Sequence, residues 1–245
     1  MISLKLQPEY IFSFLDFGIS NTFFTSFLVT IFLSLGALFF YSHKKERGFL
    51  KISFYIFTLE LLRLIDSVIK NKEISKRVFP LVATFFIFIT CCNLFSLVPG
   101  FLGSFYIKTE RGNLPLLKSP NSDLNTTLAL ALFSVFFTQV FVIRNIGFRG
   151  YLLRFFNFLN PIKLILGIFE LISEFTRILS LSFRLFGNIL SGEILLLLII
   201  FLFPLFLPLP FLLLEFFIGI IQAFIFSVIT LSFISLPLRS HLKGR

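Results

Sequence analysis

The sequence predicts an all-α membrane protein, and two features lead to this fold class. Hydrophobic residues make up 57% of the 245 residues and charged residues only 14%, with a mean hydropathy of +0.97, so lipid must be the solvent for much of the surface. Uncharged runs long enough to cross a bilayer as a helix of about 20 residues occur repeatedly. They lie at 17–42, 78–107, 124–143, 194–214 and 216–238. A single helical domain over 1–245 follows.

The first predicted elements are an outer N-terminal segment, 1–20, and a span over 21–42. Residues 43–77 carry nine Lys and Arg residues, whereas only Lys5 precedes the span, so the positive-inside rule places the N-terminus outside. No basic segment precedes the apolar run and no small-residue cleavage site follows it, so we expect a retained span and not a signal peptide. This topology accounts for the net charge of +10, and no nucleic-acid partner is expected.

The next element, 47–72, has the pattern of an amphipathic helix at the membrane surface. Its charged residues Glu60, Arg63, Asp66 and Lys70 recur every three or four positions, with apolar residues between them. Oppositely charged side chains at this spacing stabilise exposed helices. We therefore expect these charges to form a solvated face.

The second and third spans are predicted at 78–98 and 124–143, joined by a polar loop rich in Pro and Gly on the outer face. Pro80 lies near the start of the second span and Asn93 near its far end. Asp123 directly precedes the third span. Its carboxylate can cap the new helix or lie at an aqueous mouth, and the sequence leaves both roles open.

From residue 161 onward, charges interrupt a long apolar stretch, so lipid cannot cover every side of it. Asn160 is a candidate cap and Pro161 suits the first turn of the helix. Two long helices are predicted at about 161–193 and 211–237. The turn between them is expected among the helix-breaking prolines Pro204, Pro208 and Pro210.

Helical phase arranges the charges of these two helices. At 100° per residue, one face of the first helix carries a polar stripe of Glu170, Glu174, Arg177, Arg184 and Asn188. The carboxyl group at position 193 lies half a turn round from Arg184 and roughly 13 Å further along the axis. In the last helix, Glu215 and Gln222 are seven residues apart and share a face, as two groups on one aqueous pathway would.

Arg184 has no acidic partner within easy reach in its own helix. A charge at bilayer depth costs about 2.5 to 3.5 kcal/mol and normally marks a cavity, a partner or an ion path. Glu170 and Glu174 lie roughly 21 and 15 Å away along the axis. A carboxylate on another protein is the natural partner, because an arginine favours its ionised form and does not itself deprotonate.

Other chemistry has little support in the sequence. Cys91 and Cys92 are adjacent in an apolar run, and His43 and His241 lack ligand-type neighbours, so we expect no metal site and no cofactor. The chain has no Walker motif or glycine-rich phosphate loop. We expect it not to be an enzyme that itself makes or hydrolyses ATP.

Two segments carry a specific resemblance. "SLSFRLFGNILSGE" (180–193), followed after the prolines by "EFFIGIIQAFIFSVITLSFISL" (215–236), resembles subunit a of the rotary F-type ATP synthase. "PLVATFFIFITCCNLFSLVPG" and "SPNSDLNTTLALAL" resemble the second span and the start of the third in that family. The resemblance implies transmembrane helices plus two long tilted helices against a rotating c-ring, and an ATP-synthesis role as an ion channel. The partners implied are the c-ring, peripheral stalk subunit b and the lipid bilayer.

The resemblance also implies the roles of single residues. Arg184 matches the arginine that separates two aqueous half-channels, and Asn188 and Gln222 match its polar neighbours. Glu193 and Glu215 match the pair that lines the outer half-channel. Glu170 matches a carboxyl group of the polar helix face. Asp123 and Asn125 match the acidic and amide positions at the start of the third span.

One departure from the family pattern leaves the coupling ion open. Many relatives have a Glu and a His where this chain has Glu193 and Glu215. Two neighbouring carboxylates repel when both are ionised, so the pair is expected to share a proton. Proton transport is expected, with sodium coupling as the alternative.

Two other classes of membrane protein could also contain buried charges. A secondary transporter would also bury charges, but it usually has two related halves, and no internal similarity is found. A purely structural assembly protein would leave Arg184 without a partner.

The sequence also bears on the membrane in which the chain lies. We expect a bacterial inner membrane, which is favoured by forty Phe residues, no Trp and the Glu at 193. A mitochondrial or thylakoid membrane is the alternative.

Overall fold

The computed structural model describes residues 10–14, 17–42, 48–97, 106–109, 112–115, 118–155, 161–204 and 206–243. Within these residues, five helices are long and apolar enough to cross a membrane, which confirms the expected all-α membrane fold. These helices are α1 Asn21–Ser42, α3 Lys72–Ser96, α4 Leu124–Ile146, α6 Pro161–Leu202 and α7 Pro208–Lys243. Each contains a stretch that is apolar enough to lie in lipid, although α6 also carries the charges noted in the sequence.

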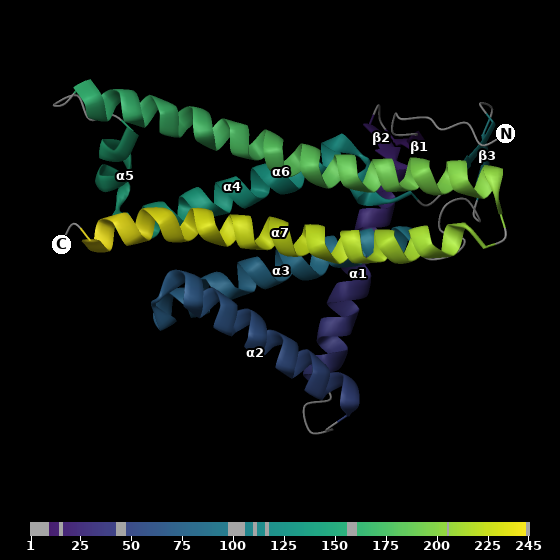
Figure 1. Cartoon of the computed structure of the whole chain (residues 1–245), viewed down its shortest axis with the longest axis horizontal. Helices are drawn as coiled ribbons and strands as arrows, with labels where there is room; N and C mark the ends of the chain where they lie inside the picture. The colour runs from purple at the N-terminus through teal and green to yellow at the C-terminus, as the bar shows by residue number, and fades with distance from the viewer. Residues whose placement is uncertain are drawn as a thin grey trace.

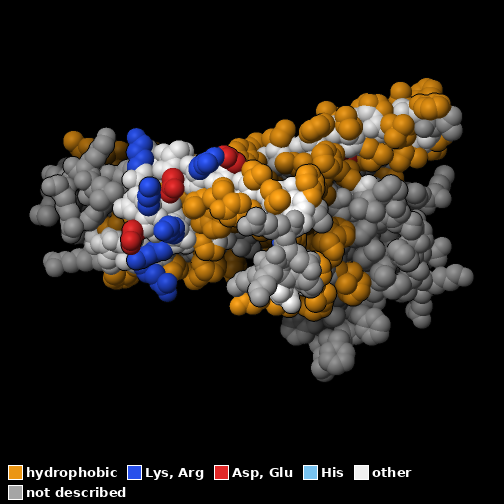
Figure 2. Space-filling view, turned by 90° about the horizontal axis from the view of Figure 1, so that it is seen from below, with side chains coloured by type: hydrophobic (Ala, Val, Ile, Leu, Met, Phe, Trp, Pro, Cys, Tyr) orange, Lys and Arg blue, Asp and Glu red, His pale blue; other side chains and the backbone are white. Residues whose placement is uncertain are grey.

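Four of these helices lie side by side along the length of the molecule, and α1 crosses them steeply (Figure 1). The turn between α6 and α7 lies at one end, near the N-terminal strands. The C-terminus lies at the opposite end, where Lys and Arg side chains gather in the view of Figure 2. By the positive-inside rule the basic end is the inner end.

The predicted surface helix is α2, Phe49–Ile69. Its buried residues Leu61, Ile65 and Ile69 pack against α3 and α7. On the exposed side, the Arg63 guanidinium and the Glu60 carboxylate lie 2.5 Å apart. Glu60, Arg63 and Lys70 are exposed, as expected for a solvated face, whereas Asp66 is half-buried.

The helix α3 begins at Lys72, earlier than the expected boundary at 78. The side chain of Asn71 accepts hydrogen bonds from the backbone N–H groups of Glu73 and Ile74, and so caps the helix at this point. Pro80 lies inside the helix and does not begin it. The cap therefore sets the start of the span, and the proline is tolerated as it often is in membrane helices.

The long helices also extend beyond their expected ends. Residues 194–202 continue α6 and do not form a span of their own, and α7 begins at Pro208. Pro208 and Pro210 lie in the first turn of α7, where the missing N–H would be unpaired in any case. At the other end, α7 continues past Pro237 to Lys243. The expected cap at 160 lies outside the described residues.

Several short elements are absent from the sequence-based prediction. A helix, α5, follows α4, and a 3-10 turn, η1, precedes α4. Two antiparallel hairpins pair β1 with β2 and β3 with β4. Their bounds are Phe148–Phe155 for α5, Pro120–Ser122 for η1, Tyr10–Phe14 for β1, Phe17–Ser20 for β2, Tyr106–Thr109 for β3 and Gly112–Pro115 for β4.

The centre of the bundle joins α3, α4, α6 and α7. Its buried side chains are Phe85, Ile89, Ala131, Leu181, Leu185, Ala223 and Phe226. Hydrogen-bonding distances of 2.8 Å between the Ser134 and Thr230 hydroxyls and 3.2 Å between those of Thr127 and Ser182 join helices across it. Small residues and hydroxyl pairs are typical of helix contacts within membranes, where burial of apolar surface gives no net drive. These contacts fix α6 and α7 relative to one another.

Candidate functional site

The side chain of Arg184 lies on the exposed surface of α6. Its Nη2 donates a hydrogen bond to Ser180 Oγ at 3.4 Å, a long and weak contact. No ion pair joins it to a carboxylate among the residues that the structure describes. Phe175 and Phe183 are exposed on the same helix. The guanidinium is thus presented to the outside of the chain within an apolar surface.

Arg184 and Gln222 line one small cavity between α6 and α7. Its volume is about 10 Å³, and Leu185 and Phe226 form part of its walls. Asn188 is half-buried one helical turn beyond Arg184. The structure thus brings Arg184 together with the Gln222 amide from the other long helix.

Glu193 and Glu215 are both buried, with only 4% and 5% of their surface exposed. Glu193 Oε1 and both carboxylate oxygens of Glu215 have no hydrogen-bond partner. The charged groups that act on Glu193 are the Glu215 carboxylate and the Lys118 ammonium, and the Ser122 side chain is its hydrogen-bond partner. Two carboxyl groups from different helices therefore share one buried polar region, as the sequence-based hypothesis of a pair requires.

Gly192 leaves space beside α6 for the Glu215 carboxylate. A Cβ atom at Gly192 would lie 2.7 Å from Glu215 Oε1 and 2.9 Å from its Cδ, closer than real Cβ contacts. Any larger residue here must displace the carboxylate. The sequence alone does not single out this glycine, because its role depends on a contact between α6 and α7.

A chain of buried amides borders the carboxyl pair. Asn121 Nδ2 donates to Asn93 Oδ1 at 2.6 Å, and Asn93 Nδ2 donates to the Gly219 carbonyl at 2.8 Å. Gly219 lies one helical turn after Glu215, and Asn121 directly precedes Ser122. These contacts join α3, η1 and α7 beside the pair. Asn93 was noted in the sequence, but nothing there indicates its partners.

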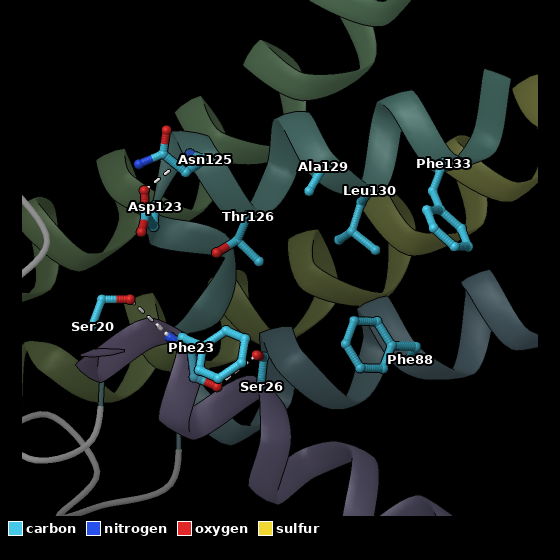
Figure 3. Close-up of a pocket in the computed structure, with 10 residues that line it drawn as sticks. All are labelled: Ser20, Phe23, Ser26, Phe88, Asp123, Asn125, Thr126, Ala129, Leu130 and Phe133. Atoms are coloured by element: carbon cyan, nitrogen blue, oxygen red, sulfur yellow. Dashed lines mark hydrogen bonds between the residues drawn. The ribbon is translucent and has the colours of Figure 1, made fainter. Parts of the chain in front are cut away.

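Asp123 caps α4 and also binds α1. Its Oδ1 accepts from the Asn125 backbone N–H at 3.0 Å, and its Oδ2 accepts from the Thr22 hydroxyl at 2.9 Å. This confirms the cap, one of the two roles left open. Figure 3 shows Asp123 and Asn125 at one end of a groove of about 490 Å³ whose other end carries Phe88 and Phe133. A role at an aqueous mouth stays a prediction.

The inner part of the polar stripe has its own contacts. Glu170 is half-buried, and the guanidinium carbon of Arg177 lies 3.0 Å from the centre of the Phe233 ring. This cation–π contact joins α6 to α7 near the inner end.

A comparison with known families decides where the chain belongs. The profile of the ATP synthase A chain matches residues 22–235. The chain belongs to this family. The matched region begins in α1 and ends in α7, so it includes Arg184, both buried carboxyl groups and the buried amides beside them.

Individual relatives support this assignment over most of their length. ATP synthase subunit a of Moorella thermoacetica is 36% identical over 181 residues, which cover 73% of this chain and 72% of that protein. ATP synthase subunit a 2 of Bradyrhizobium sp. is 37% identical over 74% of this chain and 71% of its own. ATP synthase subunit a of Helicobacter pylori is 32% identical over 90% of this chain and 92% of its own.

Among the described residues, no three His, Cys, Asp or Glu side chains lie close enough together to hold a metal ion. Cys91 and Cys92 are free thiols within α3. The chemistry that the site can supply is therefore that of two carboxyl groups, one guanidinium and several amides.

Proposed function

We propose that this chain is the stationary, ion-conducting subunit of an ATP synthase membrane sector. In this role it carries protons to and from the carboxyl groups of a rotating c-ring, which couples ion flow to rotation and ATP synthesis. The observation that carries the proposal is the position of Arg184, which is exposed on a largely apolar helix and forms no ion pair with a carboxylate among the described residues. A charge in that position is suited to meet a carboxylate on a moving neighbour.

The buried pair is proposed as part of the outer half-channel. Glu193 is a neighbour of Ser122 in η1, and both carboxyl groups lie in the parts of α6 and α7 that are nearer the turn between these helices, at the end of the bundle opposite the C-terminus (Figure 1). Because both are short of hydrogen-bond partners, a proton shared between them can pass from one carboxyl group to the other. Asn93 and Asn121 supply fixed amide dipoles beside this path.

Arg184 is proposed to separate this path from the inner one. A ring carboxylate that approaches the guanidinium is stabilised in its ionised form and releases its proton towards the inner side. Arginine does not take up or release the proton itself, so it blocks direct passage between the two paths. Gln222 and Asn188 are proposed to hold the guanidinium in place, and Glu170 to line the inner path.

Partners and location follow from the same proposal. The chain acts in a complex with other ATP synthase subunits, and we propose the c-ring and peripheral stalk subunit b as direct partners. We assign no catalytic step on ATP to this chain. It is a multi-pass membrane protein, and we propose the bacterial inner membrane as its location.

The coupling ion provides the direct test of this function. We expect the assembled complex, reconstituted in vesicles and supplied with ATP, to acidify the vesicle interior in buffer free of sodium. A pH-sensitive dye inside the vesicles measures this, and added sodium should leave the rate unchanged. Uptake of sodium that a protonophore stimulates would establish the sodium-coupled alternative, and transport of neither ion would contradict the proposal.

Replacing Gly192 with alanine should impair ion transport without preventing assembly. The new Cβ would displace the Glu215 carboxylate. Because this carboxylate is the flexible end of its side chain, it can move without separating the helices, so the complex should still assemble. We expect ATP-driven acidification to fall about tenfold, since a displacement of about 1 Å at a reacting group can cost up to a hundredfold.

The matched control is Gly36→Ala in α1, where a Cβ would meet nothing within 4 Å. Its transport should equal that of the unmodified chain. Equal transport by the alanine variants at 192 and 36 would show that the position of the Glu215 carboxylate does not matter.

A further inference from the structure

A second groove lies between α3 and α4, away from the carboxyl pair. Its volume is about 500 Å³. Arg77 from the first part of α3 and Arg144 from the last turn of α4 both line it. Most of its remaining wall is apolar and includes Leu81, Phe85, Phe137 and Phe141. The groove therefore combines two fixed cations with a long apolar surface.

The two arginines lie at the inner end of the bundle, where the headgroups of the inner leaflet would be. Both side chains are exposed. Glu73 lies 4.0 Å from Arg77, but both partners are mostly exposed, with 87% and 69% of their side-chain surface accessible. An exposed pair at this distance contributes little. The Arg77 guanidinium therefore keeps most of its capacity to bind another anion.

The apolar wall continues beyond the groove towards the outer half of the molecule. Phe133 lines this groove and also the groove of Figure 3, where its ring is drawn beside Leu130 and opposite Phe88. A hydrocarbon chain that starts between the arginines can therefore follow aromatic surface along α4. This shape suits an anionic head with an apolar tail, and does not suit a small soluble anion.

We propose that this groove binds one anionic phospholipid of the inner leaflet. The phosphate lies between Arg77 and Arg144, and one acyl chain lies along Phe85, Phe137 and Phe141. The planar guanidinium group matches the oxygens of a phosphate, and basic pockets between membrane helices on the inner side are suited to anionic headgroups. The bound lipid fills the seam between α3 and α4. This site does not depend on the proposed ion pathway.

Photoactivatable lipids test the proposal on the full chain in its assembled membrane complex. The probes are phosphatidylglycerol and phosphatidylcholine with the same diazirine-bearing acyl chain, each added to membranes of the same composition. We expect phosphatidylglycerol to label residues 77–85 and 133–144 about tenfold more than phosphatidylcholine, as two cations near the headgroup imply. Mass spectrometry of the peptides locates and measures the label.

Paired variants show whether the arginines cause the preference. Arg77→Gln combined with Arg144→Gln should reduce phosphatidylglycerol labelling to the phosphatidylcholine level. Lys72→Gln combined with Lys76→Gln removes the same charge at exposed positions of α3 outside the groove, and should leave the labelling unchanged. Val140→Trp fills the apolar part and keeps both arginines, and should reduce labelling by both lipids.

Three results would overturn the lipid site. These are equal labelling by the two lipids in the unmodified chain, unchanged preference in the double arginine variant, and a diazirine at the groove that reaches another protein chain in place of lipid. The last result would show that a partner helix covers the groove. If the arginine variant does not accumulate, the comparison of the two lipids on the unmodified chain and the Val140→Trp variant still decide the question.

Discussion

Replacing Arg184 with alanine is expected to abolish ATP synthesis driven by an ion gradient. The guanidinium is proposed to make its decisive contact with a carboxylate outside this chain, and removal of one such electrostatic group lowers rates about 100-fold or more. The chain itself should still assemble, because the side chain is exposed and donates only a 3.4 Å hydrogen bond to Ser180. Synthesis by membrane vesicles, divided by the amount of assembled complex, measures the effect.

Two variants separate charge from local structure in this experiment. Ser180→Ala removes the hydroxyl that accepts from Arg184 and leaves the charge, so synthesis should stay close to the unmodified rate. Arg184→Gln retains hydrogen-bonding capacity in a shorter, uncharged side chain, and should fail as the alanine variant does. Retained ion-driven synthesis in the alanine variant would exclude the proposed barrier between the two paths.

The fold was largely predictable because its signals are local. Hydropathy along the chain finds α1, α3, α4 and most of α7, and proline positions place the turn between α6 and α7, whereas the apolar run at 194–214 is divided between these two helices. The start of α3 was missed because the side chain of Asn71 decides it, while Pro80 is the more conspicuous residue. The β1–β2 and β3–β4 hairpins lie in segments that the sequence indicated only as polar or outer.

The candidate site was only partly predictable for a related reason. Helical phase gives which residues share a face of one helix, and the resemblance to a family suggested that Glu193 and Glu215 act together. Neither can show that Gly192 gives the Glu215 carboxylate its space, or that Asn93 joins Gly219 to Asn121. Those contacts depend on how helices far apart in the sequence are placed against one another.

Removing the carboxyl group of Glu215 should separate stability from function. Glu215 is 5% exposed and neither carboxylate oxygen has a hydrogen-bond partner, so the group costs free energy in its present position. Glu215→Leu fills a similar volume without that cost and should be at least as resistant to thermal unfolding as the unmodified chain. ATP synthesis should nevertheless fall about 100-fold, because a positioned proton-transfer group typically contributes that much.

Glu215→His distinguishes a proton relay from a merely structural role. An imidazole can still take up and release a proton, so this variant should retain clearly more synthesis than the leucine variant. Glu60→Leu makes the same change from carboxylate to hydrocarbon on the exposed face of α2, where it removes only a surface ion pair, and synthesis should be nearly unchanged. Synthesis rates and melting temperatures of the three assembled variants provide the comparison. Equal synthesis by the histidine and leucine variants at 215 would mean that proton binding at this position contributes nothing, and the outer path would then have to pass elsewhere.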